Sequence, residues 1–388
     1  MAGRGAAEVL WWAGVGLVVY AYAGYPLVLA LIARVRRRTI VRDDVDRPVT
    51  FIITAHNEAA RLAAKIDNTL AQSYPADRLE IIVASDGSTD ETDDIARRYA
   101  PRVRLVRTAE RRGKEAAQQA AVECATGDVL VFSDVATALD RDAVRTITAN
   151  FADPTVGCVS SIDRFIDDDG RVSGEGAYVR YEMRLRELET NANTLVGLSG
   201  SFFAARREAC RPWKADRQSD FNTLLNSMAQ GLRGVLDVHS VGYYRNISDP
   251  HREFERKVRT VVRGLYVLSS SAGMLNPLTH GLFAWQLASH KLCRWLVPFG
   301  LIVAALATAA LATQSPWYFA AALVQIAFYG AAAIGITTGA PRLRVPAFFV
   351  LANAAVLVAW VRFARGERIV SWTPSTRSSG PIANAPHI

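Results

Sequence analysis

The chain has 388 residues, of which 50% are apolar, and it carries a formal net charge of +8. This length allows one sizeable globular domain with attachments. The four cysteines lie far apart, so we expect neither a disulfide framework nor a structural zinc site. Basic residues cluster beside apolar segments, which is typical of membrane anchoring, so the positive charge does not indicate a nucleic-acid partner.

Long segments without charged residues occur in both halves of the chain. No charge lies between Glu8 and Arg34, or between Arg294 and Arg342. A hydrocarbon core about 30 Å thick requires roughly 20 apolar helical residues. The first segment therefore predicts one membrane crossing, and the second predicts two. Basic residues at 34–38 predict that the N-terminus faces out and that the domain after it is cytoplasmic.

A shorter apolar run covers residues 345–361 and is near the lower limit for a crossing, about 17 residues. Arg362, Arg365 and Arg368 favour a cytoplasmic tail, so we predict that this run is interfacial or re-entrant. The chain is then a multi-pass protein of the cell membrane, with the lipid bilayer as a partner. Its predicted parts are a transmembrane helix with a basic flank (1–38), a cytoplasmic domain (39–248), amphipathic interface helices (249–295), hydrophobic helices (296–363) and a cytoplasmic tail (364–388).

The cytoplasmic domain alternates short apolar runs with helical stretches. Near-continuous apolar strands separated by helices predict a mostly parallel sheet covered on both faces, an α/β fold. Such folds bind ligands beyond the carboxyl ends of their strands. The predicted strands are 51–54, 81–84, 103–106 and 129–132, and the predicted helices are 59–71, 90–99 and 114–124.

Polar residues collect at three of these strand ends, in the segments 54–58, 85–90 and 133–134. Asn57, Ser88 and Thr89 have an alternative interpretation as helix caps, and 86–87 as a simple turn. The chain has neither GxGxxG after the first strand nor GxxxxGK[ST], which argues against a dinucleotide-binding dehydrogenase and a P-loop NTPase. A nucleotide would be held by carboxylates and backbone at the strand ends.

In these motifs the sequence resembles the family 2 glycosyltransferases of the GT-A fold, a Rossmann-like sheet flanked by helices. It is similar to the membrane-integrated branch that includes hyaluronan, cellulose and poly-N-acetylglucosamine synthases. The motif at 86–90 reads DGSTD, as in the family. The order and spacing of the motifs along the chain are specific to this family. The resemblance implies a glycosyltransferase that uses a UDP-sugar at the inner face of the membrane.

The resemblance also assigns donor-binding residues. Asp86, followed by Gly87, would read the uracil, and Lys114 would lie near the donor, although a solvated lysine at a helix start is equally compatible with the sequence. Asp134 is the first acid of the family's DxD motif, but Ala136 replaces the second, so dependence on Mg²⁺ or Mn²⁺ is in question. The residues that would wrap the nucleoside are Thr54, Ala55, His56 and Glu58.

On the acceptor side, Ser199 and Gly200 resemble the family's glycine-containing strand, where small residues let a sugar approach the backbone. The alternative is a tight turn before a core strand. Asp220 matches the general base, which takes a proton from the acceptor hydroxyl, whereas Ser219 replaces the acid before it. The alternative interpretation of Asp220 is a helix N-cap.

Two further matches lie closer to the C-terminus. Arg259 matches the arginine of the QxxRW motif and would neutralise the leaving diphosphate, with Arg256 in place of the glutamine and Thr260 in place of the tryptophan. The segment 371–377 resembles the gating loop of these synthases, in which Trp372 and Arg377 would contact the nucleotide. The alternative for this segment is a basic disordered tail.

Three functions remain open from the sequence. The first is an inverting transferase that makes a cell-envelope or extracellular polysaccharide on a glycan acceptor. The second is a single transfer to a lipid-linked acceptor, which the loss of the tryptophan at Thr260 favours. The third is a nucleotide-binding scaffold whose catalytic residues have decayed, as Ala136 and Ser219 would suggest. The sequence does not identify an accessory subunit.

Overall fold

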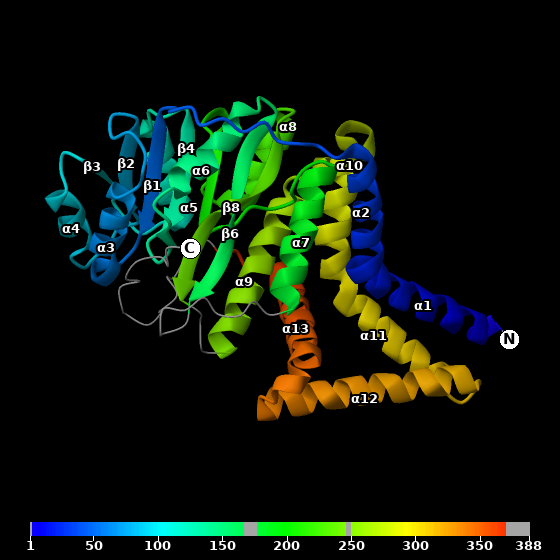
Figure 1. Cartoon of the computed structure of the whole chain (residues 1–388). Helices are drawn as coiled ribbons and strands as arrows, with labels where there is room; N and C mark the ends of the chain where they lie inside the picture. The colour runs from blue at the N-terminus through cyan, green and yellow to red at the C-terminus, as the bar shows by residue number, and fades with distance from the viewer. Residues whose placement is uncertain (1, 167–176, 246–249, 370–388) are drawn as a thin grey trace. The chain divides into compact units, whose positions relative to one another are not determined.

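The computed structural model describes residues 2–166, 177–245 and 250–369 (Figure 1). Contacts divide the chain into two compact units. We call them the helical unit, which comprises Met1–Leu31 and Asp249–Arg368, and the sheet unit, which comprises Ile32–Ser248 and Ile369–Ile388. Each is described by itself.

An eight-stranded sheet forms the centre of the sheet unit, in the order β3-β2-β1-β4-β7-β6-β8-β5. The strands β3, β2, β1 and β4 run parallel to one another, as the alternating sequence pattern predicted. The other half is mixed, because β7 runs antiparallel to both β4 and β6. The bounds are β1 Val49–Ala55, β2 Leu79–Ser85, β3 Val103–Arg107, β4 Val129–Asp134, β5 Ala138–Leu139, β6 Val156–Ile166, β7 Phe202–Arg206 and β8 Arg233–Arg245.

Helices cover both faces of this sheet, which explains why its central strands are apolar on both sides. Along β1, Phe51 and Ile53 pack into the core with α3, α4 and α6, whereas Ile52 packs into the core with α5 and α8. The predicted α/β fold is therefore confirmed. The helices of this unit are α3 Ala59–Leu70, α4 Thr92–Arg98, α5 Lys114–Cys124, α6 Ala143–Ala149, α7 Ala177–Ala192 and α8 Ser219–Ala229.

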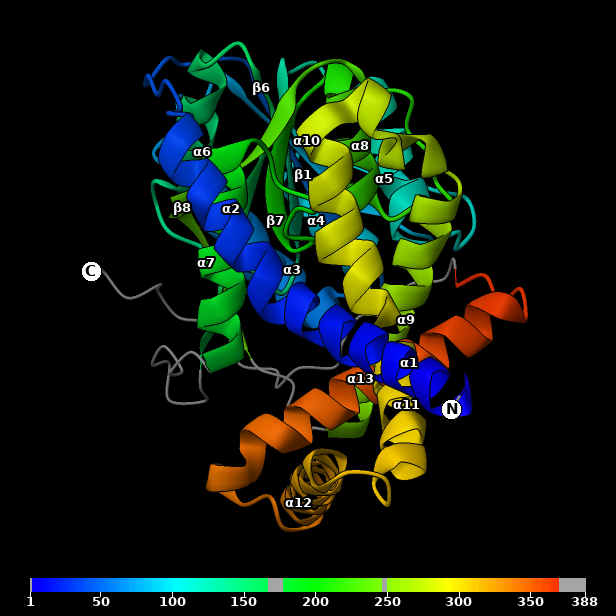
Figure 2. The ribbon, with the colours of Figure 1, turned by 90° about the vertical axis from the view of Figure 1, so that its right-hand side faces the viewer.

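The helical unit contains several long apolar helices, and α1 packs across α11 (Figure 2). A Cβ atom built on Gly14 would lie 2.5 Å from the carbonyl oxygen of Gly300, so the absence of side chains lets the two helices approach closely. The elements are α1 Ala2–Val19, the first part of α2 Tyr25–Arg36, which continues into the sheet unit, α9 Pro250–Ser269, α10 Pro277–Leu287, α11 Arg294–Leu311, α12 Pro316–Thr338 and α13 Arg344–Ala364, with π-helical turns at Tyr20–Gly24 and Ala288–Cys293.

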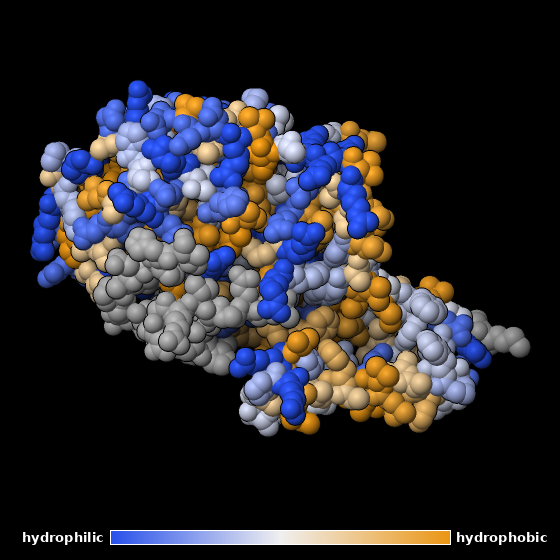
Figure 3. Space-filling model, in the orientation of Figure 1, coloured by the Kyte–Doolittle hydropathy of each residue, from blue (hydrophilic) through white to orange (hydrophobic). Residues whose placement is uncertain are grey.

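Four helical stretches among the described residues are long and apolar enough to cross a membrane: Gly3–Arg36, Pro277–Leu311, Pro316–Thr338 and Pro341–Ala364. Apolar side chains gather on the surface of α12 (Figure 3), where Leu323, Val324 and Ile326 are all more than half exposed. A membrane would cover such a surface. The last stretch has 24 residues and is long enough to span, so an interfacial or re-entrant run at 345–361 stays a prediction.

Candidate active site at the strand ends

The end of β1 is tied to the segment after β2. His56 Nδ1 lies 2.7 Å from the carbonyl oxygen of Asp86. Asn57 has a φ of +52°, its N–H donates to Ser88 Oγ at 3.2 Å, and its side-chain oxygen accepts the N–H of Thr89 at 2.8 Å. The N-cap residue of α3 is Glu58, whose side chain makes no capping hydrogen bond. The alternative of Asn57 as a helix cap is therefore wrong, because its side chain links two strand ends.

Two contacts order the rest of this strand end. Gln118 Nε2 of α5 donates to Thr54 Oγ1 at 3.1 Å, and Ala55 is fully buried. Both carboxylate oxygens of the buried Glu58 accept hydrogen bonds from Arg61, each at 2.8 Å. Burial raises the pKa of Glu58, and the Arg61 guanidinium opposes this shift. The nucleoside-binding role of these residues remains a prediction.

Asp86 holds the loop that leads into α5. Its carboxylate is fully buried and accepts the backbone N–H of Arg112 at 2.8 Å and that of Gly113 at 2.9 Å. Gly87 has a φ of +57°, and a Cβ atom there would lie 2.7 Å from the backbone nitrogen of Arg111. Only glycine accommodates both the left-handed backbone and this close approach. Asp86 therefore fixes the start of α5, beside its predicted role in reading the base.

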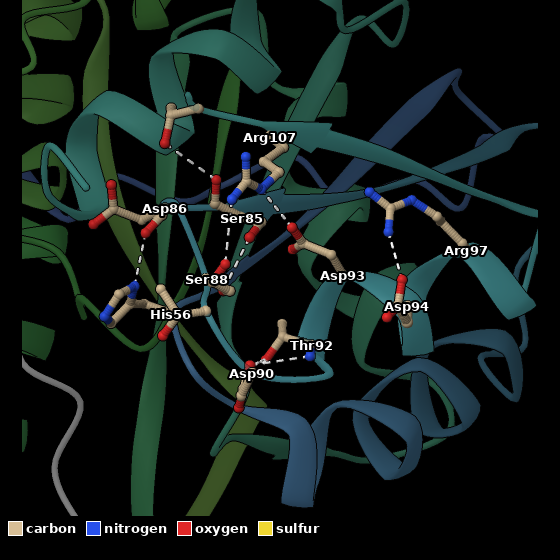
Figure 4. Close-up of polar contacts among 12 residues, drawn as sticks. His56, Ser85, Asp86, Ser88, Asp90, Thr92, Asp93, Asp94, Arg97 and Arg107 are labelled. Atoms are coloured by element: carbon tan, nitrogen blue, oxygen red, sulfur yellow. Dashed lines mark hydrogen bonds and ion pairs between the residues drawn. The ribbon is translucent and has the colours of Figure 1, made fainter. Parts of the chain in front are cut away.

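Further polar contacts make the DGSTD segment rigid (Figure 4). Asp90 accepts the N–H of Thr92 at 3.0 Å and the N–H of Ala59 at 3.1 Å, so one carboxylate joins the starts of α4 and α3. Arg107 of β3 forms a 2.6 Å ion pair with Asp93. Contacts with α3, α4 and β3 thus fix the conformation of the segment after β2, as a preorganised ligand site requires.

Lys114 is the first residue of α5 and is only 7% exposed. Its ammonium donates to Asp134 Oδ1 at 2.5 Å and to the carbonyl oxygen of Gly200 at 2.9 Å. A cation at a helix N-terminus is disfavoured by the helix dipole, and the Asp134 carboxylate compensates for this. The alternative of a solvated lysine is therefore wrong: Lys114 joins β4 to the segment before β7.

A second lysine supports the same strand end. Lys65 of α3 is 3% exposed, and its ammonium donates to Ser133 Oγ and to the carbonyl oxygen of Thr137, both at 2.7 Å. Burial lowers the pKa of Lys65 to about 7, and the nearby Asp134 carboxylate opposes this shift. These contacts hold the residues on either side of the turn at 134–136, on the face of the sheet that α3 covers.

The buried ammonium predicts a specific pH dependence of stability. Below the folded pKa of Lys65, about 7, the buried ammonium is charged and lowers the free energy of unfolding by its full amount. This loss of stability shrinks as the pH rises towards the ordinary lysine pKa of 10.5. We expect the melting temperature of Lys65→Met, relative to the parent protein, to be highest near pH 6 and to fall towards about pH 9. Lys214→Met is the control. A difference independent of pH would contradict the assignment.

The segment before β7 is fixed by Asp163 of β6. Ser199 Oγ donates to the Asp163 carboxylate at 2.7 Å, and Ser201 Oγ donates to it at 2.5 Å. The backbone N–H of Ser199 donates to Ser160 Oγ at 2.7 Å. The two serines flank Gly200, so these contacts set the direction of the Gly200 carbonyl that Lys114 uses.

Asp220 lies against the other side of Gly200. A Cβ atom built on Gly200 would lie 3.3 Å from Asp220 Oδ2. Helix α8 begins after its N-cap Gln218, and Asp220 is in the first turn, where it accepts the N–H of Phe221 at 2.9 Å. The N-cap alternative for Asp220 is therefore wrong. The helix N-terminus favours a negative carboxylate here, and a side chain at position 200 would displace it.

The residues present fit a divalent cation poorly. Mg²⁺ and Mn²⁺ prefer several hard oxygen ligands. Asp134 already shares Oδ1 with the Lys114 ammonium, and Ala136 offers no ligand. Within the described ranges, no group of three or more His, Cys, Asp or Glu side chains is arranged to hold a metal.

The remaining predicted residues belong to the helical unit or lie outside the described residues. Arg256 and Arg259 are on α9 of the helical unit, where Arg256 donates to both oxygens of Glu253 at 2.7 and 2.8 Å. Their roles at the diphosphate stay predictions. Trp372 and Arg377 lie outside the described residues.

Sequence reasoning missed Lys65 and Asp163. A signal existed for Lys65, because it falls between Leu62 and Ile66 on the apolar side of a predicted helix, where a charge needs a partner. Asp163 gave no such signal, because its contact with Ser199 joins β6 to the segment before β7, and the sequence does not predict the pairing of these two strands.

Comparison with known proteins assigns a family to part of the chain. Residues 50–212 match the model of Glycosyl transferase family 2. The match ends before Asp220, so it does not cover that residue, whose role stays a prediction.

Curated relatives match shorter regions. Glycosyltransferase AglD of Haloferax volcanii is 34% identical over 129 residues, which are 31% of this chain and 21% of that protein. The poly-beta-1,6-N-acetyl-D-glucosamine synthase of Staphylococcus aureus is 27% identical over 167 residues, which are 42% of this chain and 40% of the synthase. The chain thus spans less than half the length of either relative.

One solved structure resembles almost the whole chain. The mannosyltransferase PcManGT from Pyrobaculum calidifontis, in complex with GDP-Man and Mn²⁺, has a TM-score of 0.72 and 25% identity, and the match covers 92% of this chain and 99% of that one. Together with the family match and the strand-end site, this similarity identifies residues 50–212 as a family 2 glycosyltransferase domain of the GT-A fold.

Proposed function

We propose that the protein is an inverting glycosyltransferase, which moves a sugar from a nucleoside diphosphate to a glycan or lipid-linked acceptor at the inner face of the membrane. One observation carries this proposal. The Asp220 carboxylate lies beside Gly200. The carbonyl oxygen of Gly200 accepts a hydrogen bond from the Lys114 ammonium, which also pairs with Asp134. A base for the acceptor and a cation for the donor diphosphate thus flank one backbone segment.

The reaction follows from these two groups. The acceptor hydroxyl oxygen attacks the anomeric carbon of the donor sugar while Asp220 takes the hydroxyl proton. The bond between the anomeric carbon and the phosphate oxygen breaks, and the nucleoside diphosphate leaves with the electron pair. The Lys114 ammonium stabilises the negative charge that develops on the leaving diphosphate. Attack opposite to the leaving group inverts the anomeric centre.

A UDP-sugar is the donor that the DGSTD motif favours, with Asp86 near the base. The likeness to a mannosyltransferase bound to GDP-Man supports GDP-mannose as a second candidate, because that match extends over almost the whole chain. The Asp86 carboxylate already accepts two backbone N–H groups. Base selection therefore involves the 112–113 backbone as well as the carboxylate.

The acceptor has two candidate classes, both in synthesis of the cell envelope or extracellular polysaccharide. Similarity to a polysaccharide synthase supports a growing glycan. Similarity over 103 residues to a dolichyl-phosphate beta-glucosyltransferase of Trichomonas vaginalis, 35% identical and covering 31% of that protein, supports a single transfer to a lipid-linked acceptor. Thr260, in place of an aromatic residue that would hold a polymer, favours the second class.

A decayed scaffold is the remaining alternative. It predicts that the catalytic side chains have lost their contacts. In this chain, however, Lys114 donates to Asp134 and to the carbonyl oxygen of Gly200, and Asp220, close to Gly200, accepts the N–H of Phe221. These retained contacts favour an enzyme over a scaffold.

The test is nucleotide release by the purified full chain in lipid nanodiscs. A panel of UDP-sugars and GDP-mannose is incubated with a membrane lipid extract, and the products are sized. We expect release with one donor and a product that carries the sugar. A polymer would identify a synthase, and a lipid with one added sugar the single-transfer enzyme. Nucleotide binding without release from any donor would contradict the enzyme proposal and favour the scaffold.

A further inference from the structure

At the strand ends of the sheet unit, the Lys114 ammonium binds the carboxylate that the family's motif would use as a metal ligand. The family's pair of acids is reduced to Asp134, because the second position is Ala136. The remaining carboxylate is engaged by Lys114 at 2.5 Å. A divalent cation bound there would have to replace this ion pair and would gain a single carboxylate ligand, which is a weak donor set for Mg²⁺ or Mn²⁺.

The Lys114 ammonium is buried in the site rather than exposed to solvent. Its side chain is 9% exposed, and it donates to Asp134 Oδ1 and to the Gly200 carbonyl, which belong to segments that other contacts fix. The Asp134 backbone N–H donates to the carbonyl oxygen of Ser201 at 3.0 Å. The position of the cation is thus determined from α5, β4 and the segment before β7.

Lys65 adds a second positive charge behind the same turn, through its contacts with Ser133 and Thr137. Two ammonium groups and the Asp134 carboxylate leave a net single positive charge when both lysines are protonated. A divalent cation with one carboxylate would leave the same net charge. Below the Lys65 pKa of about 7, the two lysines therefore carry the same charge as the divalent cation that the aspartate pair would otherwise bind, and a diphosphate binds such positive charge.

We propose that Lys114, supported by Lys65, supplies the positive charge at the donor diphosphate, so that binding of a nucleoside diphosphate by this protein does not depend on a divalent cation. This inference rests on the proposed function, since it takes the donor to be a nucleotide-activated sugar. It separates this chain from the mannosyltransferase of Pyrobaculum calidifontis, whose complex contains Mn²⁺.

The test measures affinity rather than turnover. Binding of UDP and of GDP to the full chain in nanodiscs is followed by calorimetry, once with EDTA and once with Mn²⁺. For the nucleotide that binds, we expect the two dissociation constants to agree within about threefold, which is less than 1 kcal/mol. We expect Lys114→Met to weaken binding in EDTA by about 10–100-fold, the usual effect of losing a charged hydrogen-bond donor. Lys214→Met, in the same unit, is the matched control and should bind as the parent does.

Three results would overturn the proposal. Mn²⁺ that strengthens binding to the parent protein by more than about tenfold would show that a metal is required. Unchanged affinity of Lys114→Met in EDTA would remove the lysine from the diphosphate site. Absence of binding by the parent protein to either nucleotide, with or without Mn²⁺, would refute the proposed function itself. The measurement on the parent protein is decisive even if Lys114→Met fails to fold.

Discussion

Replacing Asp220 with Asn is expected to reduce sugar transfer by about 10²–10⁴-fold, the usual contribution of a positioned general base. The amide has nearly the same size as the carboxylate, so the contact with Gly200 is retained, but it cannot take the acceptor proton. Binding of the nucleoside diphosphate should be unchanged, because the groups assigned to the diphosphate are the ammonium groups of Lys114 and Lys65. Transfer is measured by nucleotide release, and binding by calorimetry.

The matched control for this variant is Asp216→Asn, an exposed acid four residues earlier in the chain. It should transfer sugar at the rate of the parent protein. Full activity of Asp220→Asn would exclude Asp220 as the base. A loss of nucleotide binding together with turnover would mean that Asp220 acts on the donor or on the fold rather than on the acceptor.

Replacing Asp86 with Ala is expected to lower the stability of the protein and its affinity for the donor together. The substitution leaves the buried N–H groups of Arg112 and Gly113 without their acceptor, which costs about 2–4 kcal/mol. The loop into α5 then loses its anchor, so the Lys114 ammonium is no longer held at the diphosphate position. The melting temperature and the nucleotide affinity are measured on the same preparation.

Asp94→Ala is the comparison for Asp86, because Asp94 belongs to the same acidic segment but forms an exposed ion pair with Arg97 (Figure 4). Exposed pairs contribute about 0–1 kcal/mol, so this variant should melt and bind nearly as the parent does. Equal effects of the two substitutions would contradict the account of Asp86. A stable Asp86→Ala protein that lost only nucleotide binding would leave base recognition as its sole role.

The parallel half of the sheet was predictable because each strand is a continuous apolar run followed by a helix, and a parallel pair requires such a crossover. The polar strand ends were predictable for the same reason, since parallel strands bring their carboxyl ends to one edge. The mixed half was not, because β6, β7 and β8 pair across long sequence separations and no local pattern fixes their order.

The contacts that assemble the site depend on this unpredicted half. Lys114 and Asp134 were both named from motifs, but the carbonyl that joins them to the acceptor side belongs to Gly200, which precedes the antiparallel strand β7. Asp163 fixes that segment from β6. Motifs identified which residues take part, whereas the through-space arrangement required the fold.

The assignments in the helical unit stay predictions for a different physical reason. Apolar length predicts that a helix can cross a membrane but does not determine whether it does. Arg259 lies on an amphipathic helix, on which arginines suit anionic lipid headgroups as well as a diphosphate. Side-chain chemistry alone does not separate these two uses.

The most direct test of the account is an experimental structure of the full chain in nanodiscs with a bound nucleotide or a non-transferable donor analogue. We expect the Lys114 ammonium to lie within hydrogen-bonding distance of the diphosphate, about 3 Å, and the Asp220 carboxylate to face the anomeric carbon across Gly200. A nucleotide bound away from the ends of β1, β2 and β4, or an Asp220 turned away from the sugar, would contradict it.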